Sequence, residues 1–122
     1  MPISEGYLTY VLDQLEGLGS ITVKKMFGGA GLYLDSVFFA LIADDVLYFK
    51  VDNSNQQDYE NAGMEAFMPF GEKSHIMHYF EVPVDVLEDK DKLKIWTDKA
   101  FSVAQRKLAV GKKKKKRSAP SA

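Results

Sequence analysis

Glycines and lysines gather in one segment of the sequence, KKMFGGAGLYL, which spans residues 24–34. Backbone N–H groups exposed by glycines, beside two cationic side chains, could bind a phosphate group. The spacing matches neither the dinucleotide fingerprint nor the Walker A motif, and strand-forming residues follow Gly31 where a phosphate site would need a helix. We therefore favour a structural role, in which the glycines let a long strand bulge, bend and pass close to a neighbouring element. The alternative is a small-molecule site, or the site of an uncharacterised enzyme, near residues 28–31. The residues singled out in this segment are Lys24, Lys25, Met26, Phe27, Gly28, Gly29 and Gly31.

The histidine, serine and carboxylate side chains show no catalytic or metal-binding spacing. His75 and His78 would lie on opposite faces of a strand, because strand side chains alternate, so they cannot share a metal ion. Acidic pairs such as Asp44 and Asp45 fall in turns or at a helix start, where Asp is favoured for its hydrogen bonding alone. No serine stands in a nucleophile-elbow sequence, and the chain holds no cysteine. We expect a protein that is not an enzyme, with no catalytic residue, no metal and no cofactor.

A run of basic residues near the C-terminus could contact nucleic acid, anionic lipid or an acidic protein with little sequence preference. A solvated tail with no dedicated partner is the alternative. Residues 1–111 carry 10 basic and 17 acidic side chains, a net charge of −7, so this body would repel a phosphate backbone. If this chain alone binds nucleic acid, the run should therefore supply most of the attraction. Its members are Lys112, Lys113, Lys114, Lys115, Lys116 and Arg117.

Apolar periodicity predicts an α+β fold, which would position the candidate residues of the glycine-rich segment and the basic run. Ser4 can cap a helix that ends near Gly19, and its apolar side chains recur at three- and four-residue spacing. Strand-forming runs with turn residues between them predict three strands, the first long and bent, and then a short polar helix capped by Ser54. Two further strands precede a helix that starts near Asp89 or Asp91 and runs to about Leu108. The predicted order is α-βββ-α-ββ-α, with a mainly antiparallel sheet packed by helices. The strand-forming runs cover residues 22–27, 32–34, 37–42, 46–51, 67–70 and 76–82.

Length and composition predict one domain with a disordered end. The chain has 122 residues, 46% of them hydrophobic, which is enough for a single core. We assign residues 1–110 to the domain and residues 111–122, GKKKKKRSAPSA, to a disordered Lys-rich tail, because like charges repel and no apolar residue can dock. No basic leader or apolar run of about 20 residues is present, so we expect a cytoplasmic protein without a membrane partner.

Three stretches of sequence resemble the N-terminal domain of the TfoX/Sxy family of competence regulators. They read MFGGAGLYLDSVFFALIADDVLYFKVD from Met26, GMEAFMPFG from Gly63, and MHYFEVPVDVLEDKDKLKIW from Met77. The resemblance covers roughly residues 4–107 in the expected order, and it implies an α+β fold with no assigned catalytic residue or cofactor. Ser36 replaces the glycine that usually follows the turn aspartate. The chain resembles a single-domain form that lacks the family's C-terminal domain.

The resemblance also implies a function. Named members of the family promote expression of natural-competence genes together with the cyclic-AMP receptor protein. We therefore expect a bacterial, non-enzymatic regulatory protein that contacts a transcription factor such as the cyclic-AMP receptor protein, while the basic tail adds weak, nonspecific nucleic-acid affinity. A homodimer formed through an exposed sheet edge or face is a further alternative.

Overall fold

The computed structural model describes residues 4–26, 29–67 and 76–118. Four helices and six strands follow one another along these parts of the chain. The strands form one antiparallel sheet in the order β1-β2-β3-β4-β6-β5. The prediction of a single α+β domain with helices packed on an antiparallel sheet is confirmed. The elements are α1 (Glu5–Gln14), β1 (Ile21–Met26), β2 (Gly29–Leu34), β3 (Val37–Ala43), β4 (Val46–Lys50), α2 (Gln56–Asn61), β5 (Ala66–Phe67), β6 (Ile76–Glu81), α3 (Val84–Leu87) and α4 (Lys90–Ser118).

The first helix begins where the sequence predicts. The Ser4 hydroxyl accepts a hydrogen bond from the Tyr7 backbone N–H at 3.2 Å, which satisfies one of the free donors of the first turn. Val11 and Leu15, four residues apart on the inner face, are completely buried. The helix is therefore fixed by its cap and by an apolar stripe that meets the sheet.

Two tight turns set the register of the central hairpins. Asp35 and Ser36 join β2 to β3, and Asp44 and Asp45 join β3 to β4. All four residues have positive φ, between 49° and 68°, as two-residue turns of type I′ require. Asp tolerates this conformation better than most residues, and Ser36 adopts it as well. Both turns lie where the sequence predicts them.

The strand count before α2 differs from the prediction. Residues 21–34 form two antiparallel strands, β1 and β2, paired from Ile21 with Leu34 to Met26 with Gly29. The glycines therefore adjoin a chain reversal, whereas the predicted single bent strand would have placed them at a bulge. The element order is α-ββββ-α-ββ-α-α, with the four-residue α3 where the sequence predicts only a turn. A register irregularity does occur, between β2 and β3 near Leu32 and Tyr33.

The second helix is capped differently from the prediction. Asn55, not Ser54, occupies the N-cap of α2, and the Ser54 hydroxyl instead donates to the Asp52 carboxylate. Asn55 is buried, with its side chain bonded to the backbone N–H of Asp52 and the carbonyl of Lys50. The loop after β4 is therefore held by side-chain bonds to its own backbone. The predicted strand over residues 67–70 begins one residue earlier, at Ala66, and its last three residues lie outside the described part.

The last helix starts at its predicted cap and continues further than predicted. The Asp89 carboxylate accepts from the backbone N–H groups of Asp91 and Lys92, at 3.0 and 3.2 Å. The apolar side chains of α4 form one stripe, in which Leu93, Ala100 and Val103 are completely buried. The helical backbone extends to Ser118 where the sequence predicts an end near Leu108, because lysine is a good helix former and cations are favoured at a helix C-terminus. The disorder of residues 111–122 stays a prediction.

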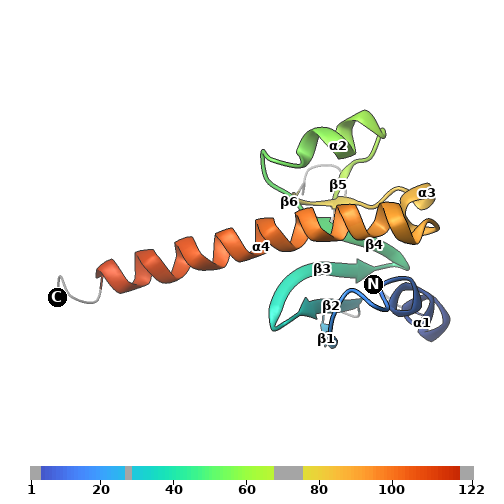
Figure 1. Cartoon of the computed structure of the whole chain (residues 1–122), viewed down its shortest axis with the longest axis horizontal. Helices are drawn as coiled ribbons and strands as arrows, with labels where there is room; N and C mark the ends of the chain where they lie inside the picture. Colours follow the sequence, from blue (N-terminus) through green and yellow to red (C-terminus); the bar gives the residue numbers. More distant parts are fainter. Residues whose placement is uncertain (1–3, 27–28, 68–75, 119–122) are drawn as a thin grey trace.

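The described helices pack against one face of the sheet. Their buried side chains, Val11 of α1, Tyr59 of α2, Leu87 of α3 and Leu93 of α4 among them, join one core cluster with the inward residues of the strands. Figure 1 shows α4 packed over the sheet and continuing well beyond the rest of the molecule. We call this side the helix-covered face and the other side the second face.

The second face carries aromatic side chains outside the main core. The rings of Tyr33 and Phe38 stack with centroids 5.1 Å apart, and Phe38 reaches Tyr79 at 6.0 Å. The Lys50 ammonium donates to the Tyr79 hydroxyl at 3.1 Å and lies 4.8 Å from the centre of its ring. Tyr79 is buried among these residues and not in the main core with its neighbour Phe80.

Candidate functional site

The glycine-rich segment lies at one edge of the sheet. Lys24 and Lys25 are exposed on β1, the edge strand, while Gly29 and Gly31 are buried on β2. A Cβ atom added at Gly29 would overlap the carbonyl oxygen of Ile42 on the neighbouring backbone, so this glycine permits a close approach. Met26 ends β1, and Phe27 and Gly28 lie outside the described residues. Close packing at Gly29 agrees with the structural role that we favour from the sequence.

The basic run lies in the last turns of α4. Lys112, Lys116 and Arg117 fall within the helix that ends at Ser118, and Figure 1 shows this part of the helix projecting away from the sheet. The glycine-rich segment and the basic run belong to different elements, the edge strand β1 and the projecting end of α4. The structure therefore does not combine the two predicted sites into one.

His78 is the histidine that the described part of the chain contains, and it does not belong to a metal-binding cluster there. His78 is exposed on β6, with its Nδ1 atom 3.2 Å from the ammonium of Lys107, and His75 lies outside the described residues. Within the described ranges, no group of three His, Cys, Asp or Glu side chains could hold a metal ion.

An open groove lies at one end of the sheet, between α1 and α3. It encloses about 320 Å³ where β4 begins and β6 ends. Leu47, Val82 and Leu87, all buried, form its apolar floor. We call it the α1–α3 groove. Its lining residues are Tyr7, Tyr10, Asp45, Val46, Leu47, Glu81, Val82, Val84, Leu87 and Glu88.

The rim of the α1–α3 groove combines exposed apolar side chains with carboxylates. Tyr10 is 38% exposed and Val84 is 63% exposed, high values for side chains of this kind. Burial raises the pKa of Tyr7, against the lowering effect of a hydrogen bond with the Leu47 backbone, and the charge of Asp45 raises it further. The Tyr7 hydroxyl therefore lies in the negative field of the groove and stays protonated at neutral pH.

A second hollow of about 320 Å³ lies beside α4, lined by Ser54, Asp98, Lys99, Ser102 and Arg106. Its charges are largely satisfied within the protein. Lys99 pairs with Asp58 at 2.7 Å, and Arg106 pairs with Asp52 at 3.2 Å. Burial acts to raise the pKa of Asp52, but hydrogen bonds from Ser54 and Arg106 outweigh it and leave the pKa lowered. This hollow links α2 and α4 and offers a partner little unpaired charge.

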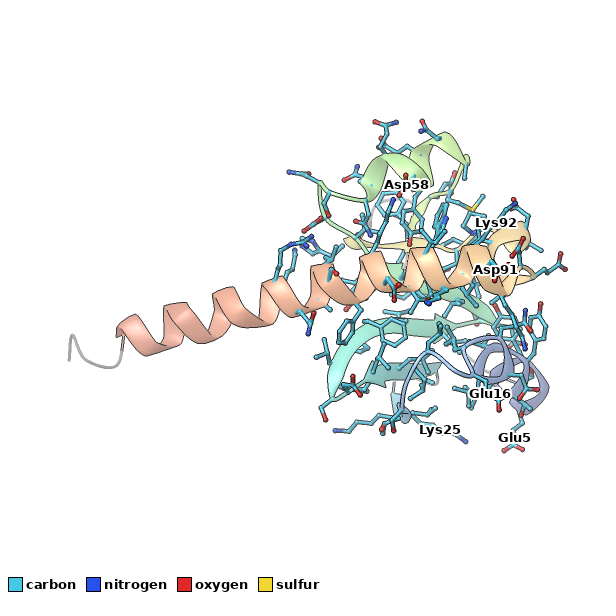
Figure 2. The ribbon with its side chains drawn as sticks, in the orientation of Figure 1. Glu5, Glu16, Lys25, Asp58, Asp91 and Lys92 are labelled. Carbon is cyan, nitrogen blue, oxygen red and sulfur yellow. The ribbon has the colours of Figure 1, made fainter. Side chains whose placement is uncertain are left out.

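The α1–α3 groove is the feature that reasoning from the sequence missed. Neither hollow is lined by the glycine-rich segment or by the basic run. The groove draws its residues from three separate segments, so no local motif marks it. One signal was available: residues 1–20, 44–47 and 81–89 together contain nine acidic side chains and no lysine or arginine. Figure 2 shows two of these, Glu5 and Glu16, extending from α1 and the turn after it at this end of the molecule.

These features define a small α+β domain whose antiparallel sheet is packed by helices on one face and ends in an acidic, partly apolar groove. The chain belongs to the TfoX N-terminal domain family, whose sequence model matches residues 13–104. The resemblance stated from the sequence is therefore confirmed. No curated protein matches the chain. Within the described residues, no helix has the length and apolar character needed to cross a membrane.

Proposed function

We propose that this protein is a non-enzymatic regulator that acts by contact with another protein, in the manner expected of a TfoX-type co-regulator of transcription. Membership of the family supports this proposal. The observation that carries it is the α1–α3 groove, where Tyr10 and Val84 remain exposed beside an apolar floor. Exposed apolar side chains beside a hollow are typical of surfaces that bind other proteins.

The partner proposed from the family resemblance is a transcription factor such as the cyclic-AMP receptor protein. The basic run of residues 112–117 would add weak affinity for the nearby DNA, because lysines release counterions from phosphates without reading sequence. The acidic body would remain away from the DNA backbone. The protein would then be held at a promoter chiefly by its protein partner.

The experiment is a gel-shift assay with the full chain, the cyclic-AMP receptor protein of the same organism, and promoter DNA that carries its site. We expect a further shift when the chain is added to the receptor–DNA complex, and little shift with DNA alone at physiological salt. A matched variant with residues 112–117 changed to glutamine should weaken the ternary complex without abolishing it. Absence of any ternary complex at micromolar protein, by gel shift and by sedimentation, would refute this partner.

A further inference from the structure

The α1–α3 groove has the shape and lining of a side-chain pocket. Its floor is apolar, and Tyr10 of α1 and Val84 of α3 leave apolar surface in contact with water. A partner that covered these two side chains would gain the hydrophobic free energy of removing that surface from water. An apolar residue is therefore one half of the chemistry that the groove recognises.

The charge of the groove supplies the other half. Asp45, Glu81 and Glu88 line it, and none of them forms a salt bridge with any described residue. The Asp45 carboxylate accepts one hydrogen bond, from the Ser4 backbone N–H at 2.7 Å. The three segments that line the groove, residues 1–20, 44–47 and 81–89, hold nine carboxylates and no lysine or arginine, and Lys90 is the first cation after them. A cation entering this field would be attracted over several ångströms and would replace water at carboxylates that lack a counter-charge.

We propose that the α1–α3 groove binds an arginine or lysine side chain of a partner protein, next to an apolar residue of the same segment. The cationic head would lie between Glu81, Glu88 and Asp45. Its methylene stem and the neighbouring apolar residue would cover Tyr10 and Val84. This inference rests on the proposed function, since it names the chemistry of the partner that the regulator contacts.

Nucleic acid and the chain's own basic run fit the groove less well than a partner protein does. Nucleic acid is repelled by the carboxylates. In the described helix the chain's own basic run lies away from the groove, because α4 starts beside the groove and Lys112 lies 22 residues further along the helix. At 1.5 Å per residue that is a separation of about 33 Å. A separate protein segment is the occupant that remains.

The first test is an NMR titration of the ¹⁵N-labelled full chain with the peptide acetyl-Leu-Arg-Leu-amide. The matched control is the same peptide with citrulline, which has the shape of arginine but no charge. We expect saturable shifts at the amides of Tyr10, Asp45, Glu81 and Val84 with the arginine peptide, weaker at high salt, and no saturable shifts with citrulline. Equal shifts with both peptides, or none with either, would overturn the inference. Shifts of the same size with spermidine would overturn the assignment to a protein side chain.

The second test uses isosteric variants of the full chain. Glu81→Gln combined with Glu88→Gln should weaken arginine-peptide binding about fivefold, the effect of losing two exposed or half-buried charge contacts. Glu60→Gln, an exposed change on α2 far from the groove, should leave binding unchanged. Equal weakening by both variants would show a general charge effect and overturn the site.

The two proposals fail in different ways. If the ternary complex forms and survives Glu81→Gln with Glu88→Gln at unchanged affinity, the groove inference is wrong while the regulatory function stands. If the arginine peptide binds the groove but no ternary complex forms, the site stands and the proposed partner is wrong. Circular dichroism of the double variant would confirm that it is folded, since glutamine keeps the size and shape of glutamate.

Discussion

The two faces of the sheet carry similar aromatic residues, but those residues are buried to different degrees. On the helix-covered face, Leu47 and Phe49 are at most 1% exposed and belong to the main core. On the second face, their neighbours in β4, Tyr48 and Lys50, are half-buried, and their polar ends reach other side chains or water. Burial therefore alternates along β4, as it does in a strand with one covered face. One strand therefore contributes to the hydrophobic core on one face and to an amphipathic surface on the other.

The largest effect is expected at the centre of the helix-covered face. Phe49→Ala should lower the free energy of unfolding by about 3–5 kcal/mol, because it leaves a cavity beside the Phe39 ring, whose centroid is 5.7 Å away. Urea denaturation followed by circular dichroism measures this change. Phe49→Leu, which keeps most of the volume, should cost much less. A loss below about 1 kcal/mol for alanine would contradict the assignment of Phe49 to a close-packed core.

The next effect is a pH dependence on the second face. Burial raises the pKa of Tyr79 to about 12, above the ordinary value of 10.0. A raised folded-state pKa contributes stability that is fully present below pH 10.0 and is lost as pH rises towards 12. Tyr79→Phe should therefore flatten the alkaline loss of stability in this window, by on the order of 2 kcal/mol. Parallel alkaline unfolding curves for the two proteins would show that Tyr79 is not protected in the fold.

A smaller effect is expected one residue away from Phe49. Tyr48→Ala should lower the free energy of unfolding by about 1–2 kcal/mol, since it removes a half-buried ring that contacts Phe67 at a centroid distance of 4.7 Å. The same urea assay applies. If Tyr48→Ala proved as costly as Phe49→Ala, the two faces would not differ in the way that their burial indicates.

The smallest effect belongs to the polar rim where α4 meets the end of β4. A double-mutant cycle of Asp52→Asn and Arg106→Gln should give a coupling of about 0.2–1 kcal/mol at pH 7, because the pair is partly exposed and screened. The pKa of Asp52 is lowered, so its contribution is present above the ordinary value of 3.8 and is lost as pH falls through the folded-state pKa. The coupling should therefore disappear once the pH has fallen below the folded-state pKa of Asp52. A coupling that persisted there would show that charge is not its source.

Features that depend on nearby residues were predictable from the sequence. The Ser4 cap, the turns at residues 35–36 and 44–45, and the stripe of α4 each follow from side chains within a few positions of one another. The sequence did not predict the chain reversal between β1 and β2, because a run of glycines is compatible with a bulge as well as with a turn. The choice between them depends on pairing with a distant strand, as the approach of Gly29 to Ile42 shows.

The candidate site was less predictable than the fold. Residue types that suggest chemistry, the glycines and the lysines, lie in a packed edge hairpin and at the end of a helix. The α1–α3 groove combines residues as distant as Tyr7 and Glu88. Only the fold brings such residues together. The sequence could therefore reveal that the three segments are acidic, but not that they line the same groove.

The projecting end of α4 has an electrostatic consequence. The full chain is nearly neutral, with a net charge of −1, yet its densest positive and negative groups lie at opposite ends of one 29-residue helix. Such a separation gives the molecule a large permanent dipole moment. Near a polyanion such as DNA, this dipole would turn the basic end of α4 toward the polyanion. The α1–α3 groove, with Glu81 and Tyr10, would then face away from it, where another macromolecule could approach.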